Sequence, residues 1–395
     1  MLHHDTSSEK STWSGLCFKA MLLSIMALQN TVLNLVARRS LVEATADGGN
    51  AFSKTSVVLV CELCKIVFAF ILYTFSGRHD LTEGRGSKIF PVRAAAKKVW
   101  RITTHQPLEL IKLLVPSFLY VVQNNLVLLA AENLEGPLLS VFGQMKIVTA
   151  AIFSVIMLKK KLNRQKWIAI LLLFIGVCSV QVSQMQDPKL PRFLMEEEKL
   201  LIKDKEPYTA GSPVDGTELK YAKKEALSGD GGRKNLPLGL QAVTGAVLIS
   251  GFAGVYFERV LKESDISVWI RNIHLGFFGA IGAAGVIWWT PTERSHVETQ
   301  GLFAGYTGIV WCLVFVQAGG GLIVAAVVKY TDNILKIFST SVSIILVCAT
   351  SILFLGFPTS ILFFVGATLT VLSIFLYGEI INIPHAQKDS NLSEQ

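Results

Sequence analysis

Residues 137–158 read PLLSVFGQMKIVTAAIFSVIML, an apolar run that contains a single charged residue, Lys146. A helix needs about 20 mostly apolar residues to cross the hydrocarbon core of a bilayer, because it advances by about 1.5 Å per residue. The run is long enough, and a helix satisfies its backbone polar groups without water. Residues 137–158 are therefore predicted to span a membrane.

The same pattern recurs along the whole chain. Hydrophobic residues make up 51% of the 395 residues, charged residues make up only 17%, and the mean hydropathy is +0.48. Soluble domains contain about 25% charged residues, so the composition argues against a soluble enzyme. The predicted fold class is an all-α integral membrane protein with ten transmembrane helices, at residues 16–36, 56–75, 110–130, 137–158, 167–182, 238–261, 268–289, 306–328, 333–355 and 360–377.

Basic residues between the spans predict the orientation of the chain. Lys and Arg gather between the second and third spans and between the fourth and fifth, whereas most connections on the opposite side contain few. Positively charged loops stay in the cytosol, so both termini are expected there. Such loops also offer a source for the formal net charge of +8. The lipid bilayer is therefore the expected partner, and nucleic acid is not.

The ten spans divide into two groups of five. The predicted parts are a cytosolic N-terminal tail (1–15), a first five-helix half (16–182), a polar flexible linker (183–236), a second half (237–378) and a cytosolic C-terminal tail (379–395). Met145-Lys146-Ile147 and Leu335-Lys336-Ile337 occupy comparable places in the two halves, although short apolar helices also resemble each other by chance. Because five is odd, the halves would cross the membrane in opposite directions, like the inverted repeats of secondary carriers.

Four charged residues lie inside predicted spans, where a charge costs a few kcal/mol. Lys146 and Lys336 have no acidic partner within a turn, apart from Asp332 one turn before Lys336, and two such cations in one cavity would attract a phosphate or diphosphate. The alternative is that they reach the headgroup region, especially Lys336, which is near a helix end. Glu62 and Lys65 are three residues apart on one helical face, so they either neutralise each other structurally or belong to a site.

Other polar or small residues have both a structural and a functional interpretation. Tyr120, Gln123, Asn124 and Asn125 crowd the third span, where amides can recognise a base or sugar hydroxyls, or can bind neighbouring helices. Ser250, Gly251 and Gly254 in the sixth span favour either close helix packing or close approach of a ligand. No nucleotide-binding Walker sequence is present, and Cys61-x-x-Cys64 has no second ligand pair. We therefore expect no catalytic residue, metal or cofactor.

Five motifs together resemble a known family. They are YVVQNN at residues 120–125, QMK at 144–146, GFAGVYFE at 251–258, SVWIRNI at 267–273 and VKYTDNILK at 328–336. In this order they closely resemble the nucleotide-sugar transporters of the Golgi, in the branch with the UDP-galactose, UDP-N-acetylglucosamine and CMP-sialic acid carriers. The resemblance covers nearly all of the membrane region and omits the linker and both tails.

The resemblance implies a ten-helix carrier of the drug/metabolite transporter superfamily that exchanges a cytosolic nucleotide sugar for a luminal nucleoside monophosphate. It assigns the phosphates to Lys146 and Lys336, the nucleoside to Tyr120, Asn124 and Asn125, and a cavity position to Asn272. It also assigns the span-six wall to Ser250, Gly251 and Gly254 and a charged pair to Glu62 and Lys65. Gln144 and Asn333 stand in two of the matching motifs and complete the expected substrate-binding site.

One departure from the family pattern affects the expected substrate. Leu139 and Gly143 stand where relatives commonly have Tyr, and a lost aromatic weakens base stacking. Residues 272–278 and 317–322 look more like the UDP-sugar carriers. The predicted function is exchange of UDP-galactose, UDP-N-acetylglucosamine or both for UMP. The alternatives are a CMP-sialic acid/CMP exchanger and a non-transporting scaffold for glycosyltransferases, and a homodimer or a glycosyltransferase complex stays open.

Overall fold

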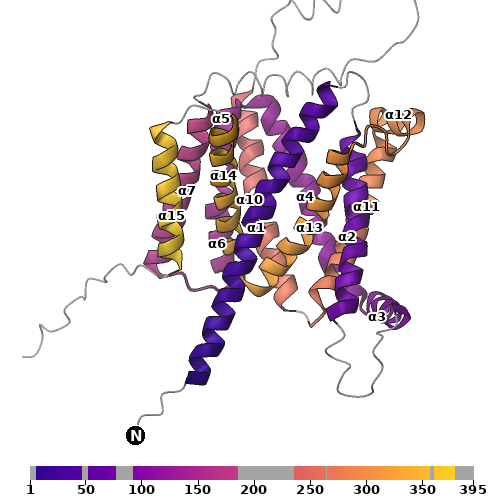
Figure 1. The fold of residues 1–395 in the computed structure, drawn as a ribbon, viewed down its shortest axis with the longest axis horizontal. Helices are drawn as coiled ribbons and strands as arrows, with labels where there is room; N and C mark the ends of the chain where they lie inside the picture. The colour runs from indigo at the N-terminus through magenta and orange to yellow at the C-terminus, as the bar shows by residue number, and fades with distance from the viewer. Residues whose placement is uncertain are drawn as a thin grey trace, which may run out of the picture.

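The computed structural model describes residues 6–46, 52–76, 92–185, 235–263, 265–355 and 360–378, and this part of the chain is helical without strands (Figure 1). The helices are α1 (Thr6–Ala46), α2 (Lys54–Ser76), α3 (Val92–His105), α4 (Pro107–Asn133), α5 (Gly136–Gly143), α6 (Lys146–Leu158), α7 (Arg164–Met185), α10 (Leu236–Lys262), α11 (Val268–Trp289), α12 (Pro291–Gln300), α13 (Gly308–Tyr330), α14 (Asn333–Leu355) and α15 (Ile361–Tyr377).

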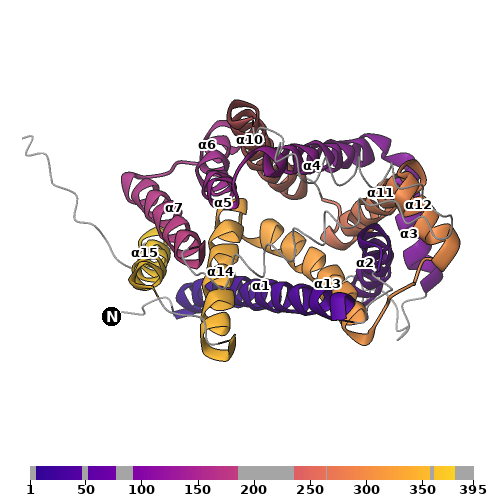
Figure 2. The same ribbon diagram turned by 90° about the horizontal axis from the view of Figure 1, so that it is seen from above.

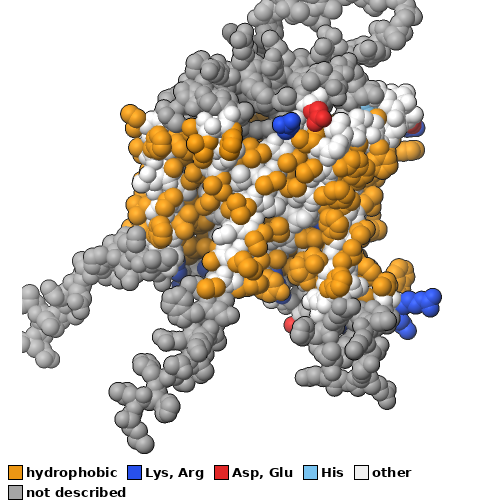
Figure 3. Space-filling model, viewed as in Figure 1, with side chains coloured by type: hydrophobic (Ala, Val, Ile, Leu, Met, Phe, Trp, Pro, Cys, Tyr) orange, Lys and Arg blue, Asp and Glu red, His pale blue; other side chains and the backbone are white. Residues whose placement is uncertain are grey.

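The protein is a multi-pass membrane protein. Within the described residues, nine helical segments are long and apolar enough to cross a bilayer, and α15 is a shorter apolar helix of 17 residues. Together they occupy the ten predicted positions, and the count of ten spans stays a prediction because of the length of α15. Hydrophobic side chains cover much of the flank of the bundle, as a lipid-facing surface requires (Figure 3).

The structure adds helix where the sequence predicted connections. Helix α1 begins at Thr6 and ends at Ala46, so part of the predicted N-terminal tail and of the first loop is helical. The connection after the second span contains α3, and the connection after the seventh contains α12. Residues 186–234, nearly all of the predicted flexible linker, and residues 379–395, the predicted C-terminal tail, lie outside the described residues.

The two halves pack with an approximate two-fold relation. Helix α1 contacts α13 and α14, and its counterpart α10 contacts α4 and α6, the counterparts of α13 and α14. The pairs α2 with α11 and α7 with α15 join equivalent helices of the two halves (Figure 2). Helix α1 starts at the end of the bundle where α15 finishes, whereas α10 starts at the opposite end (Figure 1). These contacts support the predicted inverted repeat.

Glycine permits close packing of α7 against α15. A Cβ atom on Gly176 would lie 2.8 Å from the carbonyl oxygen of Gly366, and a Cβ on Gly366 would lie 2.6 Å from that of Gly176. Both clashes involve backbone atoms, which cannot rotate away. Small residues let membrane helices approach closely and gain van der Waals contact, so Gly176 and Gly366 set the distance between these two helices.

Candidate functional site

The fourth predicted span is interrupted just before Lys146. Helix α5 ends at Gly143 and α6 begins at Lys146. Between them, the Gln144 and Met145 N–H groups donate to carbonyl oxygens three residues earlier, at 3.1 and 3.0 Å. Such bonds form a turn that is tighter than an α-helix, and tight turns within helices often mark functional sites. The Lys146 side chain leaves the backbone directly after this turn.

Lys146 at the start of α6 and Lys336 on α14 lie close enough for their charges to interact. The Lys146 side chain is exposed and that of Lys336 is half-buried, on helices that pack against each other. Their positive charges repel each other, and neither side chain forms an ion pair or hydrogen bond with the described residues. Two unneutralised ammonium groups inside a bundle are costly without an anion. The structure thus brings together the two lysines that the sequence singled out.

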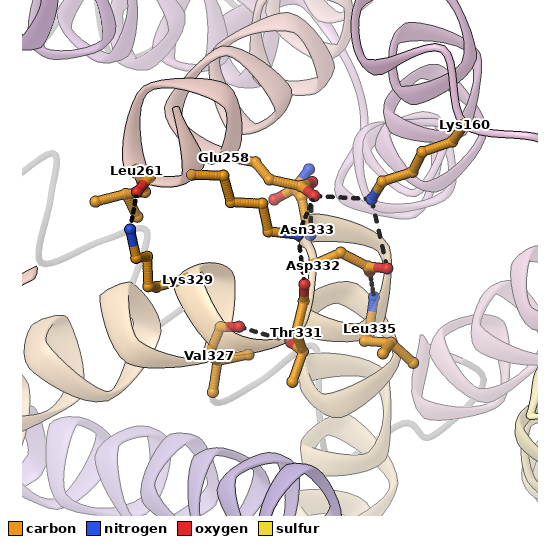
Figure 4. Close-up of polar contacts among 10 residues, drawn as sticks. Lys160, Glu258, Leu261, Val327, Lys329, Thr331, Asp332, Asn333 and Leu335 are labelled. Atoms are coloured by element: carbon orange, nitrogen blue, oxygen red, sulfur yellow. Dashed lines mark hydrogen bonds and ion pairs between the residues drawn. The ribbon is translucent and has the colours of Figure 1, made fainter. Parts of the chain in front are cut away.

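A buried carboxylate lies close to this lysine pair. Glu258 on α10 is fully buried, and its charge attracts Lys336. Glu258 Oε1 accepts from Lys262 at 2.8 Å and forms an ion pair with Lys160, whose Nζ lies 2.8 Å away, and Oε2 accepts the backbone N–H of Asn333 at 3.0 Å. Figure 4 shows these side chains converging from α10, from the α6–α7 connection and from the start of α14. The cluster joins both halves at one end of the bundle.

Asp332 completes this ion cluster. Its Oδ1 atom accepts the Leu335 N–H at 2.7 Å, so it caps α14, while Oδ2 lies 3.4 Å from Lys160 Nζ (Figure 4). Lys262 also donates to the Thr331 carbonyl at 2.6 Å. Carboxylates at a helix N-terminus are favourable because they meet free N–H groups and the positive end of the helix dipole. Glu258 and Asp332 therefore hold the first turn of α14, one turn before Lys336.

The backbone at the end of α6 positions Lys160. Lys159 adopts left-handed angles (φ 51°, ψ 32°), and the N–H groups of Lys159 and Lys160 both bind the carbonyl of Ser154. This arrangement ends the helix sharply and satisfies one of its last carbonyls. It turns the chain so that the next side chain reaches Glu258.

Sequence reasoning missed this ion cluster. Glu258 lies within the predicted sixth span and should have been counted with the other intramembrane charges. Arg271 was missed for the same reason; it is 1% exposed, inside the predicted seventh span, and pairs with Glu109 at 2.5 Å. Lys160 carried no such signal, because it was one of several basic residues in a loop.

The structure confirms that Glu62 and Lys65 form an ion pair on α2. The pair lies against two glycines on neighbouring helices: a Cβ on Gly279 would be 2.7 Å from the Glu62 carboxyl carbon, and one on Gly321 would be 2.9 Å from Lys65 Cδ. These glycines on α11 and α13 make room for charged side chains within the bundle. The pair faces the interior and not lipid.

The α10 glycines have packing roles. A Cβ on Gly251 would lie 2.6 Å from Thr149 Oγ1 on α6, and one on Gly254 would lie 2.7 Å from the Asn333 amide. Ser250 is half-buried beside them. Asn333 and Asn272 are both buried, and the Asn272 amide donates to the Val268 carbonyl at 2.9 Å. These contacts favour helix packing, and not ligand approach, as the role of the small residues on α10.

The expected nucleoside residues lie on a different helix from the lysines. Tyr120 and Asn125 are exposed on α4, whose main contacts are with α10 and α11. The side chain of Asn124 lies outside the described part of the structure. Gln144 is buried in the turn between α5 and α6. The structure therefore places the two lysines near each other. It does not by itself place Tyr120 and Asn125 near them.

Comparison with known proteins identifies the family of this bundle. The sequence profile described as "Nucleotide-sugar transporter" matches residues 14–378, which include both lysines and the ion cluster. The chain belongs to the nucleotide-sugar transporter family. It is thus a transporter and not an enzyme, as predicted, and the resemblance seen in the five motifs is confirmed.

Individual members of the nucleotide-sugar transporter family match over most of their length. The chain is 37% identical to the UDP-N-acetylglucosamine transporter of Homo sapiens, over 91% of this chain and 95% of that protein. It is 37% identical to a UDP-N-acetylglucosamine/UDP-N-acetylgalactosamine transporter of Caenorhabditis elegans, over 95% of each. It is 38% identical to the UDP-galactose translocator of Mus musculus, over 91% of this chain and 78% of that protein.

Proposed function

We propose that this protein carries a UDP-sugar, UDP-N-acetylglucosamine or UDP-galactose, across the Golgi membrane in exchange for UMP. The names of the similar transporters support the substrate class. The observation that carries the proposal is the pair of unneutralised lysines, Lys146 and Lys336, which come from different halves and lie close enough for their charges to interact. The negative charges of a diphosphate would neutralise these two lysines.

The lysine pair gives a physical reason for exchange. Without an anion, Lys146 and Lys336 repel each other inside the bundle, and rearranging membrane helices around two unneutralised charges is costly. The diphosphate of a UDP-sugar, or the phosphate of UMP, neutralises the pair. The loaded protein should therefore change conformation faster than the empty one, which couples entry of one nucleotide to exit of the other.

The ion cluster supplies the closed end that alternating access needs. Glu258, Lys160 and Asp332 tie α10, the α6–α7 connection and α14 together at the end where α1 begins (Figures 1 and 4). We propose that these ion pairs separate when the carrier opens at this end. A phosphate held by Lys336 would weaken the attraction of Lys336 for Glu258, so binding and opening would be coupled through one carboxylate.

The charges at the two ends support the proposed orientation. The end that carries α3 and the α6–α7 connection has exposed basic side chains, among them Lys97, Arg101 and Lys161, whereas exposed Glu132, Glu135 and Glu298 lie toward the opposite end. By the positive-inside rule, the basic end faces the cytosol. Both termini would then be cytosolic, and the Glu258 cluster would close the cytosolic entrance.

The remaining predicted residues complete the proposed site. Tyr120, Asn124 and Asn125 on α4 would bind the nucleoside, and the sugar would lie toward Glu62, Lys65 and Asn272. Gln144, Ser250, Gly251, Gly254 and Asn333 would shape the cavity around the lysines through the packing contacts described above.

Transport by purified protein in liposomes tests the proposal. Uptake of labelled UDP-N-acetylglucosamine and UDP-galactose is measured with and without UMP inside, with CMP-sialic acid as the competing substrate. We expect UMP preloading to stimulate uptake, Lys146→Ala to abolish it, and Lys161→Ala, a loop lysine, to leave it intact. Equal uptake with and without UMP would overturn exchange. Uptake of CMP-sialic acid without uptake of either UDP-sugar would show that the substrate is a CMP-sugar and not a UDP-sugar.

A further inference from the structure

Helix α3 lies outside the set of spans, at the basic end of the bundle. It lies across the ends of α2 and α11, at a large angle to their axes (Figures 1 and 2). Ala95 is fully buried, and with Val99 and Ile102 it packs against Tyr73 of α2 and Ile270 of α11. These contacts hold α3 against α2 and α11 at the basic end of the bundle.

The rest of α3 presents two adjacent rows of side chains. Val92 and Trp100, on one row, are 62% and 71% exposed. Arg93, Lys97 and Arg101 follow at intervals of four on the neighbouring row, and Lys98 lies beyond them; all four are exposed. Residues four apart share a helix face, so an apolar edge runs beside a basic one. In Figure 3, Lys and Arg side chains gather at this lower corner of the molecule, next to hydrophobic ones.

The basic row of α3 has no counter-charge within the described residues. Arg93, Lys97, Lys98 and Arg101 form no ion pair there, whereas Lys112 on the adjoining α4 is paired with Glu109. A pure solvent-facing surface would not need a large exposed tryptophan. Tryptophan concentrates at membrane interfaces, and an amphipathic helix of this composition lies in the plane of the interface, with basic side chains toward anionic headgroups.

We propose that α3 is a binding surface for anionic phospholipid headgroups of the leaflet at the basic end of the bundle. Trp100 and Val92 enter the boundary between headgroups and acyl chains, and Arg93, Lys97 and Arg101 bind the phosphates beside them. Thr103 Oγ1 bonds His274 Nε2 of α11 at 2.8 Å, so the lipid-bound helix is fixed to a helix of the transport bundle. The proposal does not depend on which nucleotide sugar is carried.

The test measures binding of short-chain phosphatidylserine to the purified full-length protein by native mass spectrometry, with phosphatidylcholine as reference. Each basic residue at an anionic surface strengthens binding by about fivefold. The variant Arg93→Gln/Lys97→Gln/Arg101→Gln is therefore expected to lose ten- to a hundredfold in phosphatidylserine affinity. The matched control, Lys159→Gln/Lys161→Gln/Arg164→Gln, removes the same charge from the same end and is expected to keep it.

A second measurement covers the case in which the triple variant does not fold. Lipids with brominated acyl chains quench tryptophan fluorescence, and Trp100→Phe is expected to remove a strongly quenched component from the wild-type signal. Soluble glycerophosphoserine, which has the headgroup without acyl chains, is expected not to compete. Equal phosphatidylserine affinity of wild type and the α3 variant, an equal loss in the loop control, or unchanged quenching in Trp100→Phe would overturn the proposal.

Discussion

The Lys160 ammonium group lies 2.8 Å from the fully buried Glu258 carboxylate, across the interface between the two halves of the bundle. Glu258 also binds Lys262 and the first backbone N–H of α14. One carboxylate therefore interacts with two lysines and with the N-terminus of α14. The surrounding contacts depend on that single charge.

Glu258→Gln is expected to destabilise the protein by about 1.5–3 kcal/mol, because the buried side chain loses its charge-assisted contacts with the partly exposed Lys160 and Lys262. The measurement is thermal unfolding of the purified protein in detergent. Glu263→Gln on the same helix is the control: Glu263 is paired with Arg259 at the surface, and an exposed pair contributes about 0–1 kcal/mol. Equal losses in the two variants would show that the cluster does not stabilise this end.

Lys146→Gln is expected to raise the unfolding temperature of the empty protein. The substitution removes one of two positive charges that repel each other in the bundle, and two like charges close together are unfavourable. UDP and UMP should at the same time lose most of their stabilising effect, because a ligand stabilises the folded protein in proportion to its binding free energy. A destabilised empty variant that still responds fully to UMP would contradict both roles.

Gly366→Ala is expected to cost about 1–3 kcal/mol, the usual effect of overpacking, because its Cβ would lie 2.6 Å from a backbone oxygen of α7. Gly282→Ala provides the comparison. Its Cβ would meet nothing within 4 Å, and alanine favours a helix by about 0.8–1 kcal/mol over glycine. Unfolding temperatures should therefore move in opposite directions; a shift of the same sign would argue against the close α7–α15 contact.

Glu62→Gln should destabilise the protein more than the double variant Glu62→Gln/Lys65→Gln. The single change leaves the Lys65 charge unpaired between α2 and α13, whereas the double change removes both charges. Thermal unfolding of the wild type, both single variants and the double variant gives the coupling free energy. Additive effects would mean that the two side chains act independently.

Much of the fold followed from hydrophobic periodicity and length. Among the described residues, the ten apolar segments correspond to nine helices that are long enough to cross a bilayer and to the shorter α15, because each segment must satisfy its own backbone in lipid, a local requirement. The ends of helices were less predictable. Helix α1 extends beyond its apolar run to Ala46, and α3 carries four basic residues in a connection that the hydropathy pattern did not mark as helix.

The site was predicted in part. Lys146 and Lys336 stood out because an isolated charge in an apolar run has a direct energetic meaning. Their proximity, and the convergence of Lys160 and Asp332 on Glu258, depend on how distant helices pack, which no local pattern records. The α10 glycines show the opposite case, since a small residue has the same signature whether it faces a ligand or a helix, and the contacts of Gly251 and Gly254 were needed to tell these apart.

The break between α5 and α6 has a consequence for the energy of the resting carrier. If the two halves were identical, the states open to either side would be related by a two-fold rotation and would have equal free energy. The first half has a broken helix before Lys146, whereas its counterpart α14 runs unbroken through Lys336. This difference removes the degeneracy, so the empty protein is expected to favour one orientation before any nucleotide gradient is applied.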